Sequence, residues 1–284
     1  MSGSEGRIAC FLRSKKPPIL LLIFKKEKRY YMDKILVVEK LCKDDILHNI
    51  SFCISKGEMV AVMGPSGSGK STLLYNLSGM DKPSGGKVWL TGQEITTLSE
   101  NEKAKIRLNR IGFVFQQMNM MENLNLIDNI LLPAIHANSL RKKDKKSRKE
   151  KSELEKEAKN LMKKFSIENL EKRRITEVSG GQLQRACICR SMINHPEIIF
   201  ADEPTGALNK SASEEVMDSL KMLNHEGTTI LMVTHDSRMA SQCSRILYLL
   251  DGKIQDELIL PDDSSETVQN REEKVNLWLT KMAW

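Results

Sequence analysis

Residues 64–72, Gly-Pro-Ser-Gly-Ser-Gly-Lys-Ser-Thr, have the composition and spacing of a phosphate-binding loop. An apolar run at 59–63 precedes them and an apolar helical pattern at 73–77 follows, so a strand leads in and a helix leads out. Glycines let the backbone aim its N–H groups at phosphate oxygens, and the positive end of the helix adds to the attraction. We expect Lys70 to reach the β- and γ-phosphates and Ser71 to place its hydroxyl on Mg²⁺. The alternative is a glycine-rich turn with a chance lysine. The predicted ATP-binding residues are Gly64, Pro65, Ser66, Gly67, Ser68, Gly69, Lys70, Ser71 and Thr72.

Two adjacent acids end a second apolar run, at 198–201. If that run is a strand beside the phosphate-binding loop, Asp202 is placed to hold the hydration shell of Mg²⁺. Glu203, one residue further on, is placed to polarise the attacking water as a general base. The alternative is a chance acidic pair at the end of a strand.

A second helix start with phosphate-binding character lies at 179–185, Ser-Gly-Gly-Gln-Leu-Gln-Arg. Its free N–H groups and helix dipole are suited to a phosphate, although a plain N-cap is the alternative. Since the chain already has one phosphate-binding loop, we expect this one to serve the nucleotide held by another copy. The residues predicted to do so are Ser179, Gly180, Gly181 and Gln182.

Two further polar residues lie just past predicted strands. The amide of Gln116 is placed to touch Mg²⁺ or the attacking water. His235 is placed to contact the γ-phosphate and position the water, although a lone histidine is more often structural. The predicted catalytic set is therefore Glu203, His235 and Gln116, and the predicted metal-binding set is Ser71, Gln116 and Asp202.

The elements that must position these residues alternate between strands and helices. Strand-like runs occur at 35–38, 46–54, 59–63, 87–90, 111–115, 198–201 and 229–233, and a hairpin is expected around 251–252. A helix is expected over 181–194. Capping boxes are expected at Ser99 with Glu102 and at Ser211 with Glu214, each opening a helix.

Residues 118–178 differ in character because they are highly charged and have helical periodicity. We interpret them as a helical subdomain inserted into an α/β domain. One apolar stripe at helical spacing supports this interpretation. Its members are Leu154, Ala158, Leu161, Met162 and Phe165.

Composition limits the partners of the chain. The net charge of +7 is uneven, with +6 in residues 1–30, +7 in 141–164 and −6 in the remainder, so a diffuse nucleic-acid-binding surface is not indicated. No apolar run approaches the roughly 20 residues of a membrane helix, so a membrane role requires a partner. The six cysteines lack metal-binding spacing, and we expect them to be reduced and structural.

Taken together, the loop, Gln116, residues 179–185, the acidic strand end and His235 resemble the nucleotide-binding subunit of an ABC transporter over about residues 34–258. The stretches at 64–74, 112–117 and 201–208 resemble the branch that drives macrolide and antimicrobial-peptide export and lipoprotein release. The resemblance implies a P-loop NTPase fold of α/β class, with an ABC-type antiparallel β subdomain and the inserted helical subdomain.

The resemblance also implies a function. The cofactors would be ATP and Mg²⁺, and the protein would be a homodimer in which each ATP lies between the loop of one copy and residues 179–182 of the other. It would power a separate membrane permease from the cytoplasmic face of the plasma membrane, with no nucleic-acid partner. The substrates would be antimicrobial peptides or similar amphiphilic compounds. Alternatives are an ATP-switched sensor of peptide antibiotics and an ABC ATPase without a transport role.

Some features depart from the family pattern. Cys42 occupies the position where an aromatic residue usually stacks on adenine, which predicts a weaker base contact. Asn209 replaces the usual aspartate of the D-loop, and Val178 replaces a leucine before the signature. The stretch from Ile8 to Tyr31 has no family counterpart. We expect the basic extension 1–31 to be disordered or the result of a mis-assigned start, with anionic lipid contact as the alternative. The tail at 259–284 has no readable function.

Overall fold

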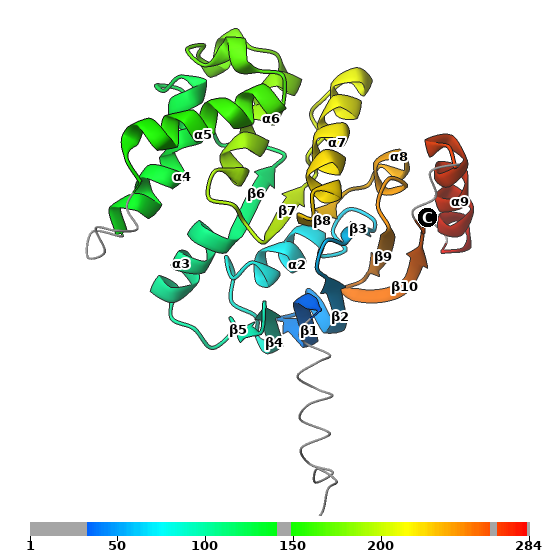
Figure 1. Cartoon of the computed structure of the whole chain (residues 1–284). Coiled ribbons are helices and arrows are strands. Elements are labelled where there is room, and N and C mark those ends of the chain that lie inside the picture. Colours follow the sequence, from blue (N-terminus) through cyan, green and yellow to red (C-terminus); the bar gives the residue numbers. More distant parts are fainter. Residues whose placement is uncertain (1–32, 141–148, 262–265, 283–284) are drawn as a thin grey trace, which may run out of the picture.

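The computed structural model describes residues 33–140, 149–261 and 266–282. The predicted N-terminal extension and most of the basic run that begins at residue 141 lie outside the described residues. The described chain forms two sheets, with helices around the larger one (Figure 1). None of the helices in this part of the chain is both long enough and apolar enough to cross a bilayer.

The first sheet is antiparallel and has the strand order β2-β1-β4-β5. Its strands are β1 (Lys34–Lys43), β2 (Leu47–Ser55), β4 (Gly85–Leu90) and β5 (Gln93–Glu94). The predicted half-buried strand at 46–54 is confirmed, since Leu47, Ile50 and Ile54 are buried and the residues between them are more exposed. This sheet corresponds to the antiparallel β subdomain that the family resemblance implied.

The second sheet has the order β10-β9-β3-β8-β7-β6. Its strands are β3 (Met59–Met63), β6 (Ile111–Phe115), β7 (Ile198–Asp202), β8 (Thr229–Val233), β9 (Arg245–Leu250) and β10 (Lys253–Ile259). All neighbours are parallel except β10, which forms the predicted hairpin with β9. Strand β3 is buried at every residue and lies between β8 and β9, so it carries the phosphate-binding loop to the centre of the sheet.

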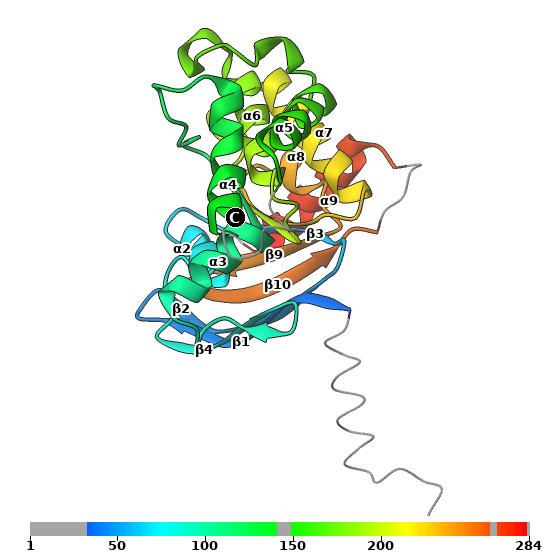
Figure 2. The same ribbon diagram turned by 60° about the vertical axis from the view of Figure 1, so that its left-hand side comes forward.

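The helices are α2 (Lys70–Leu77), α3 (Glu100–Arg110), α4 (Leu126–Leu140), α5 (Lys151–Lys164), α6 (Gly180–Met192), α7 (Lys210–His225), α8 (Ser237–Ala240) and α9 (Val268–Lys281), with 3₁₀ turns at Glu168–Leu170 and Ile175–Glu177. Helices α4, α5 and α6 stand together at one end of the molecule, away from the antiparallel sheet (Figures 1 and 2). Helices α4 and α5 and both 3₁₀ turns fall within the segment 118–178 that the sequence assigned to a helical subdomain.

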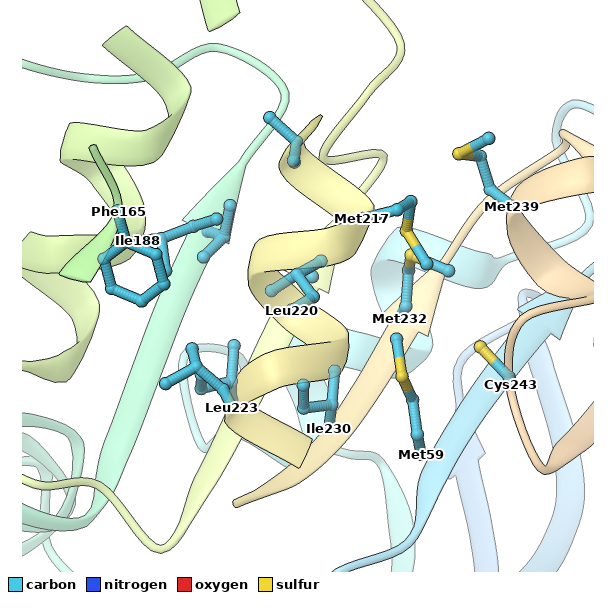
Figure 3. Close-up of a cluster of buried hydrophobic side chains, with 14 of the residues drawn as sticks. Met59, Phe165, Ile188, Met217, Leu220, Leu223, Ile230, Met232, Met239 and Cys243 are labelled. Carbon is cyan, nitrogen blue, oxygen red and sulfur yellow. The ribbon is translucent and has the colours of Figure 1, made fainter. Parts of the chain in front are cut away.

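Buried apolar side chains join the helical end to the large sheet through α7. Figure 3 shows Phe165 and Ile188 on one side of α7 and Met59, Met232 and Met239 on the other. The predicted stripe on α5 faces this core, because Leu154, Ala158, Met162 and Phe165 are buried and Leu161 packs against them. Burial raises the pKa of the Cys187 thiol to about 11 and that of Cys243 to about 12, which agrees with structural cysteines.

One of the two predicted capping boxes is wrong. The box of Ser99 and Glu102 opens α3 as expected. Helix α7, however, is capped by Asn209, whose side chain accepts a hydrogen bond from the Ala212 N–H. Asparagine is as good an N-cap as serine, so the cap lies two residues before Ser211 and the helix begins at Lys210. The carboxylate of Glu214 is then free to accept from Arg238 on α8.

Candidate functional site

The register of the large sheet brings the predicted site residues to one edge. Phe115 lies opposite Asp202, and Asp202 lies opposite Val233. Val62 also lies opposite Val233, two residues before the phosphate-binding loop begins. Since these strands are parallel, their carboxyl ends meet, and the residues that follow each strand emerge side by side.

The phosphate-binding loop depends on close backbone packing at its first residue. A Cβ added to Gly64 would lie 2.0 Å from the carbonyl oxygen of Leu249, so no larger residue fits there. The Lys70 ammonium is buried across the loop, and its Nζ donates to the carbonyls of Gly64 (2.7 Å) and Pro65 (2.8 Å). Burial lowers the pKa of Lys70, and the carboxylates of Glu203 and Asp202 oppose that shift. An ammonium has three hydrogens, so one is still available for a phosphate.

A cavity of about 660 Å³ lies over the loop. It is lined by Ser66, Gly67, Gly69, Lys70, Ser71 and Thr72 of the loop together with Ile46, Glu203 and His235. The fold therefore brings Glu203 and His235, which are far from the loop in sequence, to the same cavity as Lys70. Gly64, Pro65 and Ser68 shape the loop but do not line the cavity.

Two of the three predicted Mg²⁺ ligands, Ser71 and Asp202, are in contact. Ser71 Oγ donates to Asp202 Oδ1 over 3.0 Å. Burial raises the pKa of Asp202, while hydrogen bonds from Ser71 and Tyr75 act in the opposite direction. A hydroxyl and a carboxylate are hard oxygen donors, and Mg²⁺ commonly binds one or two such groups together with substrate phosphates. The described residues contain no cluster of three or more histidine, cysteine or acidic side chains that could hold a metal.

Tyr75 is a site residue that the sequence analysis missed. Its hydroxyl donates to Asp202 Oδ2 over 3.1 Å, so both carboxylate oxygens of Asp202 are fixed from helix α2. Position 75 reads only as an apolar helical position in the sequence, and the contact crosses 127 residues. No local signal could have found it.

We expect Tyr75→Phe to raise the Mg²⁺ concentration needed for tight ATP binding by about tenfold, the usual scale for losing a partner of a metal ligand. The ring still packs, but one oxygen of Asp202 loses its donor. Binding of a fluorescent ATP analogue, titrated with Mg²⁺, measures the effect. Binding without Mg²⁺ serves as the internal control and should not change. An unaltered Mg²⁺ dependence would exclude this role for Tyr75.

The predicted catalytic residues lie close together around Glu203. Its backbone has φ of 45°, a left-handed conformation that is uncommon outside glycine and often found at functional sites. Its N–H donates to the Val233 carbonyl, and its Oε1 lies 3.1 Å from His235 Nδ1. A Cβ added to Gly206 would lie 2.9 Å from Gln116 Nε2 and 3.1 Å from Glu203 Oε2, so the amide and the carboxylate approach the same glycine.

The helix start predicted at 179–182 is formed, but it lies away from the cavity over the phosphate-binding loop. Ser179 is the N-cap of α6, and a capping box links it to Gln182. Gly180 and Gly181 pack closely against Leu208 and Ala212 at the start of α7. None of residues 179–182 lines the cavity over the phosphate-binding loop of the same chain. One copy therefore brings together the loop, the acids and His235, but not this fourth component.

The position expected to contact a base also differs from the sequence-based expectation. Cys42 Sγ contacts the backbone of Lys40 (3.5 Å) and Asn49 (3.3 Å) within the antiparallel sheet, and it does not line the cavity. Ile46, which is 43% exposed, does line it. The apolar surface beside the loop is therefore provided by an aliphatic side chain.

Comparison with known sequences shows the family to which the chain belongs. A profile described as ABC transporter matches residues 47–206. The chain is 42% identical over 229 residues to the bacitracin export ATP-binding protein BceA of Halalkalibacterium halodurans, covering 80% of this chain and 87% of that protein. It is 41% identical to the macrolide export ATP-binding/permease protein MacB of Bdellovibrio bacteriovorus, covering 83% of this chain but only 35% of that protein.

Solved structures share the fold. The dimeric, post-hydrolysis structure of the ATP-binding cassette MJ0796 with ADP and Pi has a TM-score of 0.72 and 36% sequence identity. The match covers 80% of this chain and all of that one. The structure of cbiO1 from Clostridium perfringens, part of an ABC transporter complex, has a TM-score of 0.71 and 28% identity, covering 88% of this chain and 97% of that one.

Proposed function

Because this chain belongs to the ABC transporter family, we propose that it is the subunit that powers the export of antimicrobial peptides or similar amphiphilic compounds through a separate permease. The chain binds and hydrolyses ATP, as members of this family do. The observation that carries the proposal is the cavity that brings Lys70, Ser71, Glu203 and His235 together in a chain similar to BceA.

In the proposed reaction, the loop holds the phosphates of ATP from one side. Asp202, oriented by Ser71 and Tyr75, would hold Mg²⁺, which supplies charge neutralisation for phosphoryl transfer. Glu203 would accept a proton from the attacking water, with His235 at 3.1 Å orienting its carboxylate. The amide of Gln116 would report whether the nucleotide and water are in place.

A second copy would complete the site. Ser179–Gln182 would bind the γ-phosphate of the partner's nucleotide through the N–H groups at the start of α6. The positions of these residues support this arrangement, because within one chain they do not line the cavity over the loop. Two copies related by a twofold axis would then enclose two nucleotides.

Hydrogen bonds connect the segment around Gln116 to helix α6, and they offer a path by which hydrolysis would move the permease. Gln184 Nε2 donates to the Phe115 carbonyl over 3.1 Å. Arg190 donates to the carbonyls of Met118 (2.7 Å) and Asn119 (2.6 Å). These hydrogen bonds would transmit a movement at Gln116 to α6, the helix whose start is proposed to bind the partner's nucleotide.

A groove of about 290 Å³ lies beside this segment and is the proposed docking site for a cytoplasmic helix of the permease. It lies between β6, α3, α4 and α6, and it is lined by apolar side chains and two arginines. Its lining residues include Met80, Arg107, Leu108, Phe113, Phe115 and Arg190. The charge and shape fit an amphipathic helix with acidic residues on one face. Of the methionines after Gln116, Met120 packs on the core and Met121 is half exposed.

Met80→Glu is expected to prevent association with the permease, because it places a carboxylate at the mouth of this groove, where Met80 is 41% exposed. ATP binding by the isolated subunit should be unchanged. Co-purification of the permease with the tagged subunit measures the effect. Met222→Glu is a matched control, since Met222 is 40% exposed on α7 and does not line the groove. Equal recovery of permease with both variants would contradict this docking site.

The proposed function as a whole is tested in vesicles that contain this chain in complex with the permease that co-purifies with it. Bacitracin or a related peptide should stimulate ATP turnover and accumulate inside inverted vesicles. Stimulation without accumulation would indicate a sensor instead of an exporter. Recovery of ribosomes or DNA in place of a permease would indicate an ABC ATPase without a transport role. The proposed location, the inner face of the plasma membrane, depends on the same partner.

A further inference from the structure

The C-terminal segment, for which the sequence suggested no role, forms a helix that packs on the catalytic domain. Val275, Trp278 and Leu279 of α9 are buried. The Trp278 indole N–H donates to Asp256 Oδ2 over 2.8 Å, and its ring meets Tyr248 edge-on. Figure 1 shows α9 beside α8 and the hairpin of β9 and β10. The helix is therefore an integral part of the fold.

One buried arginine joins α9 to the end of α8. Arg271 is 9% exposed, and its guanidinium donates to four backbone carbonyls, those of Ser241 (2.7 Å), Cys243 (2.9 Å), Leu260 (3.3 Å) and Pro261 (2.7 Å). The first two follow α8 and the last two follow β10. A planar group with five N–H donors can make these bonds at once, and a lysine can replace only some of them.

Helix α8 in turn begins two residues after His235. The residue after His235 is Asp236, the N-cap of α8, which accepts hydrogen bonds from the N–H groups of Arg238 (2.8 Å) and Met239 (3.1 Å). A helix of four residues is too short to be stable by itself, so its position depends on what packs against it. The contacts that fix α8 therefore also fix the backbone beside His235, whose imidazole lies 3.1 Å from Glu203.

A second contact connects α9 to helix α8, through Arg238. Arg238 donates to Glu214 on α7 over 2.7 Å and lies 3.9 Å from Glu272 on α9. A cavity of about 420 Å³ is lined by Glu203, His235, Arg238 and Glu272 among others. The last helix of the chain therefore borders the cavity that contains the predicted general base.

We propose that α9 positions the hydrolytic site, with Arg271 and Glu272 as positioning residues that act through α8 on His235. This inference rests on the proposed catalytic role of His235. The two residues touch neither the phosphate-binding loop nor its cavity, so their loss should slow hydrolysis without weakening ATP binding.

The test compares four single variants in the full chain. Arg271→Met and Glu272→Gln should each lower kcat, by about tenfold and about threefold, because small displacements of a catalytic group have effects of this order or larger. The ATP concentration for half-maximal rate should stay within about twofold, as expected when ground-state binding is retained. Arg271→Lys should recover part of the loss. Glu273→Gln, a change at the adjacent exposed carboxylate, should have no effect.

A double-mutant cycle separates positioning from general destabilisation. In a His235→Ala background, adding Glu272→Gln or Arg271→Met should cause no further loss in single-turnover rate, since residues that act through one another are not additive. Full additivity, or an unchanged kcat in both single variants, would overturn the inference. If circular dichroism shows that Arg271→Met does not fold, the test rests on Glu272→Gln, compared alone and in the His235→Ala background. A wild-type chain without ATPase activity would instead refute the proposed function.

Discussion

Glu203→Gln is expected to abolish steady-state ATP turnover, with a loss of about 10²–10⁴-fold, the usual contribution of a general base. The amide has the shape of the carboxylate and can still meet His235 Nδ1, but it cannot take a proton from water. The loop is untouched, so ATP should still bind. Since hydrolysis is what reopens the proposed dimer, this variant should accumulate as a closed dimer with ATP.

Phosphate release and size-exclusion chromatography in Mg-ATP measure the two halves of this prediction. Glu197→Gln is the matched control, because Glu197 precedes the opposite end of the same strand and pairs with Arg110 there. That change should leave turnover near the wild-type rate. Normal hydrolysis by Glu203→Gln would remove Glu203 from the role of base, and a monomer in Mg-ATP would argue against the closed dimer.

Ser179→Asp is expected to stop hydrolysis while each subunit still binds ATP. Aspartate is as good an N-cap as serine and is favoured by the helix dipole, so α6 should stay folded. It places a negative charge where the partner's γ-phosphate would bind. We expect turnover to fall by at least about 10²-fold, the scale seen when one transition-state donor is lost.

The control for this prediction is Ser179→Asn, which provides an equally good cap without the charge. We expect it to lose far less activity than Ser179→Asp, so that the difference isolates the electrostatic effect on the phosphate. Binding of a fluorescent ATP analogue should be the same for both variants. If both variants hydrolyse ATP equally well, Ser179 has no contact with the nucleotide.

The sequence predicted the parts of the site that lie at the ends of regular elements. Glu203 and His235 each follow a buried strand, and parallel strands must bring their carboxyl ends to one edge. The chemistry of the phosphate-binding loop is carried by consecutive residues and needs no long-range information. For these reasons the αβ order and the cavity around Lys70 agree with the sequence-based account.

Features that depend on distant contacts could not be predicted. Tyr75 reads as a core position, but its hydroxyl meets Asp202 across 127 residues. Glu214 fits a local capping box, but Asn209 forms the cap and Glu214 accepts from Arg238 instead. Arg271 reads as one charge in a polar tail, whereas it is buried among carbonyls from two other elements.

We infer that one chain contains only part of a working site, because residues 179–182 do not line the cavity over its own phosphate-binding loop. ATP turnover per subunit of the wild-type chain, measured over a dilution series with sedimentation velocity at each concentration, tests this inference. We predict that turnover falls in step with the fraction of dimer, while monomers still bind the nucleotide through the loop. Turnover that is independent of concentration in a sample shown to be monomeric would contradict this inference.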